Sequence, residues 1–302
     1  MQKIQNDFLV NSLENNFSLH TNHKPLLIDT FLFYNEMDLL KARLEYLGET
    51  VDYFIISEAN IDFSGKEKGF GLDKDVISML PHATKIIYHQ EHINLNSFFW
   101  LIKRIRYRNR PTRLLWKIQD SQRNALLKPL RRFDPTDIII FSDLDEFPNK
   151  KAIDEAIHVL SNPNSLQKHL CFSCQQLFFY YNIQNAAPKD LFHGSIFTNL
   201  STLRQLLPHK LRSQKDSLPH IQNGGWHFSY FMDEEKILSK VLAITDVENL
   251  SQYKNLSTQE IQRKILNGLD LYDRQTELSK EEQKNLPTSV LGPLKKYLPH
   301  CT

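Results

Sequence analysis

The sequence predicts an α/β fold built on an open, mostly parallel sheet flanked by helices, and three observations support this prediction. Apolar segments of strand length alternate with segments whose apolar residues recur at helical spacing. Residues 138–142 (IIIFS) form an apolar, largely β-branched run, which is typical of a central parallel strand buried on both faces. Polar clusters follow three of the predicted strands, which is where ligands bind in open α/β sheets.

Strands and helices are expected to alternate through the first part of the chain. The strands are expected at 26–33, 51–57, 84–88, 138–142 and 171–181. The helices are expected at 38–47, 120–132 and 153–160, and most of the chain after Glu234 has a helical pattern with a Pro-rich end. Asp38 is the expected N-cap of the first helix, and Gly48 stands where that helix would stop.

We expect a single domain, because no internal repeat and no low-complexity linker divides the chain. Residues 1–24 are polar and lack a period, which predicts a weakly ordered lead-in. Residues 25–235 are expected to form the core, with 236–302 as a helical C-terminal extension of the same domain.

The composition narrows the class of protein. With 41% hydrophobic and 24% charged residues, the chain is neither collagen-like nor disordered. Its 3 cysteines are too few for a disulfide framework or a Cys₄ zinc site, which favours free thiols in a reducing compartment. No apolar run approaches the roughly 18 residues that a membrane span needs, and we find no signal-peptide pattern. We therefore expect a cytoplasmic protein without a signal peptide or transmembrane anchor.

A basic run follows an aromatic cluster between residues 98 and 117. Its members are Lys103, Arg104, Arg106, Arg108, Arg110, Arg113 and Lys117, preceded by Phe98, Phe99 and Trp100. Such a run could contact anionic lipid headgroups or a phosphorylated acceptor, which predicts peripheral contact with an anionic membrane. It could equally be a solvated helix whose aromatic start packs into the core. Nucleic acid is not expected as a partner, since the net charge is only +2 and no supporting motif is present.

An acidic cluster follows the buried strand at 138–142. Asp143 and Asp145 are two residues apart in an extended segment, so their side chains should point the same way while Glu146 starts on the other face. Two convergent carboxylates predict a Mg²⁺ or Mn²⁺ site that keeps positions open for substrate phosphates. This arrangement suits the diphosphate of a nucleotide sugar. Alternatively, the acids only favour the dipole of the helix after Pro148.

Several blocks of sequence are specific when taken together in this order and spacing. They lie at 27–65 (containing FYNE), 120–124 (DSQRN), 138–148 (IIIFSDLDEFP) and 224–231 (GGWHFSYF), with a weaker block at 268–274 (GLDLYDR). In these blocks, which span most of the chain from about residue 25, the sequence resembles glycosyltransferase family 17. The resemblance implies a GT-A-like fold, a UDP-GlcNAc-type donor, a divalent metal and inversion at the anomeric carbon.

The resemblance also bears on the partners. It implies a UDP-sugar donor and a glycan or glycolipid acceptor. Animal members of the family carry a membrane anchor and a lumenal stem, for which we find no counterpart here, so we expect an acceptor other than an N-glycan.

The strand ends supply candidates for binding the nucleotide. Asn35 and Glu36 follow the first strand and could bind uracil or ribose, or could form only a capping turn before the helix. Glu58 ends the second strand, where an acid commonly accepts a hydrogen bond from ribose; alternatively it is an exposed carboxylate. Arg123 could hold the diphosphate, although a salt bridge to Asp120 on the same helix is the rival interpretation.

The GGWH block supplies two further candidates. Two glycines let the backbone come close to a ligand at this point. Trp226 could pack against a sugar, and His227 could complete the metal shell of Asp143 and Asp145. The alternative is that His227 is a hydrogen-bonded core residue, as histidines near aromatic side chains often are.

The catalytic base of an inverting transfer must be a carboxylate that takes the proton of the acceptor hydroxyl. Glu146 is the first candidate because it adjoins the metal pair, and Asp233 is the second. Further alternatives are Glu234, Asp246 and Glu248.

Two other functions compete with a glycosyltransferase. A metal-dependent phosphohydrolase could use Asp143 and Asp145, but such enzymes place the motif near the N-terminus and carry Thr or Val where this chain has Phe147. A non-catalytic glycan-binding module could use the aromatic residues at 178–181, but it would not need acids clustered at strand ends.

Overall fold

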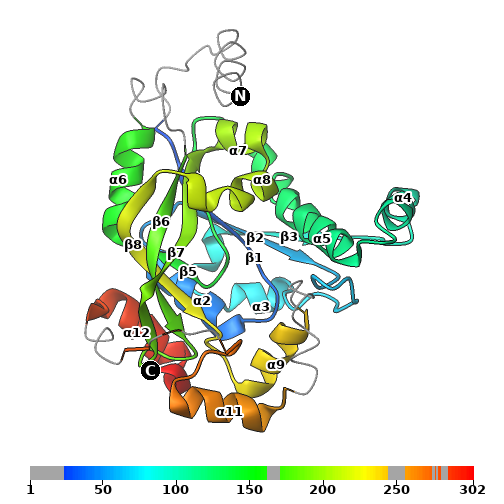
Figure 1. Ribbon diagram of the computed structural model, residues 1–302. Coiled ribbons are helices and arrows are strands. Elements are labelled where there is room, and N and C mark those ends of the chain that lie inside the picture. The colour runs from blue at the N-terminus through cyan, green and yellow to red at the C-terminus, as the bar shows by residue number, and fades with distance from the viewer. Residues whose placement is uncertain (1–23, 162–170, 244–255, 274–275, 277, 280–284) are drawn as a thin grey trace, which may run out of the picture.

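The computed structural model describes residues 24–161, 171–243, 256–273, 276, 278–279 and 285–302. The expected lead-in, apart from residue 24, lies outside these residues. The described chain builds one 8-stranded sheet in the order β3-β2-β1-β4-β7-β6-β8-β5, with helices on both sides (Figure 1). Parallel pairing joins β1–β2, β1–β4, β2–β3 and β6–β8, and antiparallel pairing joins the other three pairs. The open, mostly parallel α/β sheet is thus confirmed.

The parallel half of the sheet is the half that the sequence predicts. It consists of β1 (Leu27–Leu32), β2 (Tyr53–Ala59), β3 (Ile86–Glu91) and β4 (Ile138–Phe141). In the register, Thr30 of β1 lies between Ile55 of β2 and Phe141 of β4. All four residues of β4 are buried, as expected for a strand covered on both faces.

The other half contains three strands that pattern reading misses. Alongside the expected β6 (Cys171–Tyr180) lie β5 (Glu146–Pro148), β7 (Ala186–Asn199) and β8 (His220–Ser229). Pro188 and Gly194 interrupt β7, and Gly224 with Gly225 interrupts β8, and such residues lower the strand propensity of a segment. These strands form because their backbones complete the sheet beyond β4.

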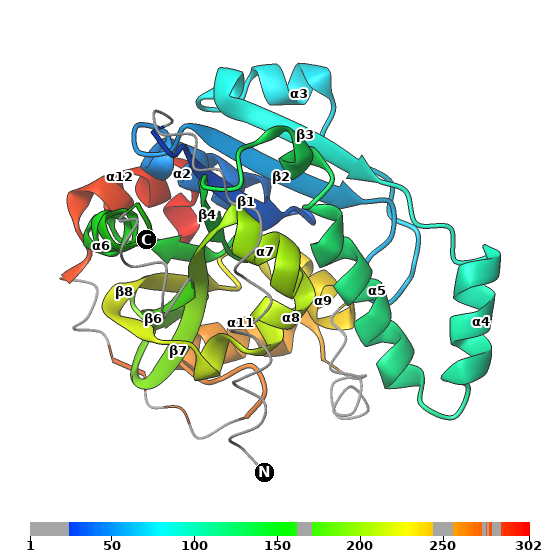
Figure 2. The ribbon, with the colours of Figure 1, turned by 90° about the horizontal axis from the view of Figure 1, so that it is seen from above.

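Helices cover the two faces of the parallel half (Figure 2). On one face, α2 (Met37–Leu47) and α6 (Lys150–Leu160) pack through leucine, isoleucine and alanine side chains against Ile138 and Ile140. On the other face, α7 (Leu200–Leu206), α8 (Pro208–Ser213) and the turn after α5 (Pro111–Ala125) pack against Ile139 and Phe141. A short helix, α3 (Lys74–Ser78), precedes β3.

The described residues after Asp233 are mainly helical, as the pattern predicts. The helices are α9 (Glu234–Ala243), α11 (Thr258–Asn267) and α12 (Thr288–Tyr297). Val290 and Leu294 of α12 pack with Leu39 of α2 and with Phe147 and Phe228. The C-terminal end therefore supports the helix that follows β1 and the strand that follows the acidic cluster.

Several predicted boundaries differ from the structure, among them those of two helices and one strand. The first helix begins at Met37, so Asp38 lies in its first turn and Glu36 takes the N-cap position without a side-chain cap hydrogen bond. The helix expected at 120–132 begins nine residues earlier, at Pro111, where a proline is pre-organised for the first helical position, and it ends at Ala125. The third strand begins at Ile86, because Ala83–Lys85 forms a 3₁₀ turn.

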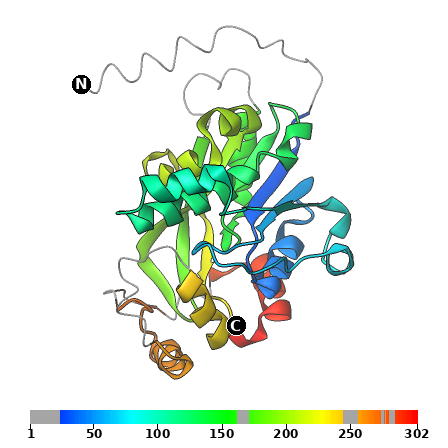
Figure 3. The same cartoon turned by 90° about the vertical axis from the view of Figure 1, so that its right-hand side faces the viewer.

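The basic run covers α4 (Phe98–Arg106) and the start of α5. Helix α4 stands away from the sheet (Figures 1 and 2), on the side of the molecule that faces the viewer in Figure 3. The expectation that its aromatic start packs into the core holds for Trp100, which is 5% exposed. It is wrong for Phe98 and Phe99, which are 79% and 59% exposed. In the part of the chain that the structure describes, no helix has the length and apolarity to cross a bilayer.

Candidate functional site

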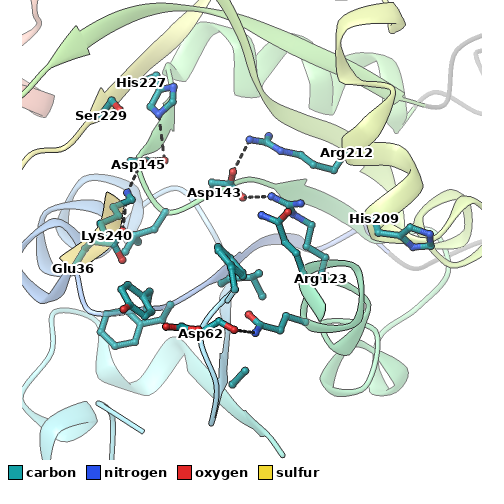
Figure 4. A pocket seen from close by; sticks show the side chains of 18 of the residues that line it. Glu36, Asp62, Arg123, Asp143, Asp145, His209, Arg212, His227, Ser229 and Lys240 are labelled. Carbon is teal, nitrogen blue, oxygen red and sulfur yellow. Dashed lines mark hydrogen bonds and ion pairs between the residues drawn. The ribbon is translucent and has the colours of Figure 1, made fainter. Parts of the chain in front are cut away.

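A large cavity lies at the carboxyl ends of β1, β2 and β4, as expected for an open α/β sheet. Its volume is about 880 Å³. One wall comes from the residues that follow β1 and β2 and from α5, and the opposite wall from β6, β7, β8, α8 and α9 (Figure 4). The two halves of the sheet therefore meet across this cavity.

The acidic loop after β4 reaches the cavity with both of its aspartates. Asp143 and Asp145 both line it, which agrees with their expected common direction. The two carboxylates nevertheless bind different partners. Asp143 accepts from Arg212 Nη2 at 2.6 Å, whereas Asp145 accepts from Lys240 Nζ at 3.2 Å and lies 3.4 Å from His227 Nε2. The loop thus presents one carboxylate to each side of the cavity (Figure 4).

Lys240 of α9 links two acids that are far apart in sequence. Its ammonium nitrogen lies 2.9 Å from Glu36 Oε1 and 3.2 Å from Asp145 Oδ2. Burial alone would raise the pKa of Asp145, but the Lys240 ammonium and the His227 imidazole hold this pKa well below its usual range. Burial would likewise lower the pKa of Lys240, and the carboxylates of Glu36 and Asp145 raise it instead. Asp145 and Lys240 are therefore both charged at neutral pH.

Two arginines occupy the other side of the acidic loop. Arg212 of α8 binds Asp143 and donates to both carboxylate oxygens of Glu146. Arg123 of α5 lies 3.6 Å from Asp143, while Asp120 pairs with Lys117 rather than with Arg123. The Arg123 Nε group is buried and has no hydrogen-bond partner among the described residues. A buried guanidinium with a free donor is suited to bind an anionic oxygen.

His227 is held between two aromatic rings. Its ring centroid lies 4.5 Å from that of Phe178 and 4.1 Å from that of Phe192. Nδ1 is buried and lacks a partner within the described part of the chain, while Nε2 faces Asp145. Trp226, the preceding residue on β8, points to the other face of the sheet and packs beside Tyr46, because neighbouring strand residues alternate between faces.

The structure brings together half of the residues that the sequence singles out. Those that line the cavity are Glu36, Arg123, Asp143, Asp145 and His227, and those that do not are Asn35, Glu58, Glu146, Trp226 and Asp233. The acids of the second group have other partners. Glu58 accepts from Lys68, Tyr88 and two backbone N–H groups, so it fastens the loop after β2. It is 1% exposed, which contradicts the alternative of an exposed carboxylate.

Neither leading candidate for the catalytic base lines the cavity. Glu146 is fully buried, bonded to Arg212 and to the backbone N–H of Asp143. Asp233 accepts from the backbone N–H of Lys236 and so caps the start of α9. Glu234 lies in the first turn of α9 and does not line the cavity, whereas Asp246 and Glu248 lie outside the described residues.

The cavity also contains residues that sequence reasoning missed, above all Arg212, Lys240 and Asp62. Asp62 lies three residues beyond β2 and accepts hydrogen bonds from Ser64 and Lys66, a turn that the strand-end rule could have found. Arg212 and Lys240 have no local signal, since each is one basic residue among several on a short helix. Only their contacts with the acidic loop distinguish them.

The donor set fits part of a divalent metal shell. Asp145 Oδ1 and His227 Nε2 are close enough for both to bind one ion, and the unpartnered Nδ1 leaves the imidazole free to adopt either tautomer. Asp143 pairs with Arg212 instead of joining them. Among the residues that the structure describes, no three His, Cys, Asp or Glu side chains form a metal-binding group. A metal here would thus take most of its ligands from substrate oxygens and water, as Mg²⁺ often does.

Comparison with known proteins identifies the family. The family model of glycosyltransferase family 17 matches residues 11–280, which is most of the 302-residue chain. A search of curated proteins found no match. The match includes every residue that lines the cavity described above. The chain therefore belongs to glycosyltransferase family 17.

Proposed function

We propose that this glycosyltransferase transfers N-acetylglucosamine from UDP-GlcNAc to a glycan hydroxyl, with inversion at the anomeric carbon, on a GT-A-like scaffold. One observation carries the proposal: Arg123, Arg212 and Lys240 converge with Asp145 and His227 on a cavity at the strand ends. Several cations around a carboxylate–imidazole pair suit a sugar diphosphate. The volume of about 880 Å³ lies at the upper end of the range for small-molecule sites, which leaves room for a donor and part of an acceptor.

The charges support a place for the leaving diphosphate near the acidic loop. Arg123 offers the unpartnered Nε donor, and Arg212 lies beside it on Asp143. In a transfer reaction the bond between the anomeric carbon and the phosphate oxygen breaks, so negative charge develops on the diphosphate. Fixed cations that face this charge stabilise the transition state more than the ground state.

The two walls support different parts of the donor. Phe33, Tyr34, Asp62 and Gln122 line the side formed by β1, β2 and α5, where the nucleotide would bind. Phe178, Phe192 and Tyr230 line the opposite side and offer aromatic surface to sugar rings. The identity of the base and sugar as UDP and N-acetylglucosamine is proposed from the family resemblance.

Metal dependence is part of the proposal. Asp145 and His227 would hold Mn²⁺ or Mg²⁺, which would supply positive charge to the leaving diphosphate. Lys240 pairs with Asp145 in the absence of the metal, so this carboxylate has a cationic partner before the donor binds.

Asp216 replaces Glu146 and Asp233 as our candidate for the catalytic base. Among the described residues that line the β6–β8 side of the cavity, it is the one carboxylate outside the acidic loop. Lys215 and His193 lie 3.3 Å and 3.2 Å from it. Burial would raise the pKa of Asp216, but the Lys215 ammonium lowers it, so the carboxylate is ionised at neutral pH.

The test is a panel of nucleotide sugars, assayed for nucleotide release with and without Mn²⁺ and with candidate glycan acceptors. We expect UDP release from UDP-GlcNAc that requires the metal and increases with an acceptor. Asp145→Asn should abolish metal-dependent donor binding, and the exposed Asp154→Asn on α6 is the matched control. Release of inorganic phosphate would instead indicate a phosphohydrolase, and glycan binding without turnover a binding module.

Asp216 is tested by a second pair of variants. Asp216→Asn should keep UDP affinity and slow transfer about 10² to 10⁴-fold, the usual worth of a general base. Glu146→Gln should instead lower stability, because it removes half of a buried ion pair with Arg212. A stable Glu146→Gln enzyme that binds UDP but does not transfer would restore Glu146 as the base.

A further inference from the structure

We propose that α4 and the start of α5 form a membrane-binding arm, which inserts its apolar face among anionic lipid headgroups. This arm comprises residues 98–113. The proposal is independent of the transfer chemistry, because it rests on surface residues outside the cavity. It concerns where the protein works rather than what it transfers.

The first observation is an apolar face on α4 that nothing in the described chain covers. Phe98, Leu101, Ile102 and Ile105 occupy positions i, i+3, i+4 and i+7, so they share one side of the helix. They are 79%, 43%, 49% and 76% exposed. Scattered exposed apolar residues are ordinary, but four on a single helical face mark an interaction site.

The second observation is how α4 is attached. Trp100 is buried in a small cluster with Ala59, Ile61, Ile93 and Ile118, and it holds the helix to the body of the protein. It lies two residues from both Phe98 and Ile102, which places it on the opposite side of the helix from the apolar face. The face is therefore turned away from the core because the anchoring tryptophan fixes the rotation of α4. Figure 1 shows the helix at the far edge of the molecule.

The third observation is charge, which decides between possible occupants. Residues 92–119 contain seven Lys or Arg and no acid. Five of these, Arg104, Arg106, Arg108, Arg110 and Arg113, are exposed. A second copy of the same arm would bring two strongly positive segments together, which disfavours self-association. An anionic bilayer suits both the positive charge and the apolar face of the arm, since its headgroups pair with the arginines and its acyl boundary accepts the apolar side chains.

The arm has a defined relation to the cavity. The same helix α5 that begins in the arm at Pro111 carries Trp116, Gln119 and Arg123 on the cavity wall. Twelve residues of α-helix separate Pro111 from Arg123, which is about 18 Å. A protein held by this arm would keep its cavity close to the membrane surface, where a lipid-linked acceptor would be found.

The experiment measures flotation of the full chain with vesicles of phosphatidylcholine alone and of phosphatidylcholine mixed with phosphatidylglycerol. We expect binding to the anionic vesicles at low salt and its loss near 1 M salt, where the Debye length falls to about 3 Å. Each basic residue at the surface changes partition about fivefold, so Arg104→Ser with Arg106→Ser and Arg108→Ser should weaken binding about 100-fold. Lys150→Ser with Lys151→Ser and Arg132→Ser, exposed positions elsewhere, is the matched charge control.

The apolar face is tested separately. Phe98→Ser with Ile105→Ser should weaken binding at least about tenfold, whereas Met79→Ser with Leu266→Ser, at 76% and 79% exposure, should not. Circular dichroism should show that all variants keep the parent melting temperature. Equal recovery with neutral and anionic vesicles would overturn the proposal. So would sedimentation that shows a dimer lost in the Phe98→Ser, Ile105→Ser variant, because the face would then be a contact between two copies.

Discussion

Arg43→Met removes the side chain that ties the acidic loop to the sheet. The Arg43 guanidinium binds Asp29 of β1 through two hydrogen bonds, from Nε at 2.8 Å and from Nη2 at 2.7 Å. Its Nη1 donates to the carbonyl oxygens of Leu144 and Glu146, on either side of Asp145. Both members of the ion pair are fully buried. The substitution therefore leaves a carboxylate uncompensated in the core and two carbonyls of the loop without this donor.

The expected loss of stability follows from the burial of the Arg43–Asp29 ion pair. Removing one partner of a buried ion pair costs about 3–5 kcal/mol, because the remaining charge has lost its compensation. Against a total stability of about 5–15 kcal/mol, such a loss is a large fraction. Asp29→Asn should cost a similar amount, and the double variant less than the sum of the two, with a coupling of about 1–3 kcal/mol. The partly exposed pair Asp38–Lys41 is the control, since its loss should cost less than about 1 kcal/mol.

The assay is urea unfolding of the two single variants, the double variant and the Asp38→Asn, Lys41→Met control, with UDP affinity measured alongside. The double variant should recover part of the stability but not the UDP affinity, since the carbonyls of Leu144 and Glu146 still lack their donor. A cost below about 1 kcal/mol for Arg43→Met, or strictly additive single and double variants, would refute the reasoning.

Three further predictions test other parts of the structure. Gly225→Ala should lower the free energy of unfolding by more than about 2 kcal/mol, because a Cβ there would lie 2.1 Å from the Phe147 carbonyl oxygen at a φ of +144°. Gly292→Ala, where a Cβ meets nothing within 4 Å and φ is not positive, should cost far less in the same urea titration. Burial would raise the pKa of Glu45, but Lys296 and Tyr297 of α12 lower it, so the contact between α2 and α12 should add stability above a pH of about 4 and lose it as the pH falls through the lowered pKa. Thermal unfolding against pH should show a weaker acid dependence for Glu45→Gln, and identical curves would contradict this role. Lys240→Met should tighten Mn²⁺ binding to the protein without donor at least about tenfold, since an ammonium no longer competes for Asp145; calorimetry that shows unchanged or weaker binding would assign Lys240 to another role.

The parts of the fold that local pattern determines were predictable from the sequence. The run 138–142 predicts a strand buried on both faces, because a short, β-branched apolar run is typical of such strands, and the structure places β4 there. The position of Asp143 and Asp145 at the cavity follows from the same reasoning, since ligands bind at the carboxyl ends of such strands. Chain direction and periodicity were sufficient for both conclusions.

The antiparallel half of the sheet and the partners of the acidic loop were decided only by the tertiary structure. β7 and β8 contain proline or glycine that weakens their local signal, and they exist because neighbouring backbones supply their hydrogen bonds. Glu146 directly follows the Asp143/Asp145 pair in the sequence, yet its carboxylate is held in the core by Arg212, 66 positions away. Asp145 meets Lys240 across 95 positions. The sequence by itself determined where the acidic loop lies. Ion pairs between distant segments depend on how the helices pack. This packing decided which carboxylates of the acidic loop face the cavity and which cations they meet.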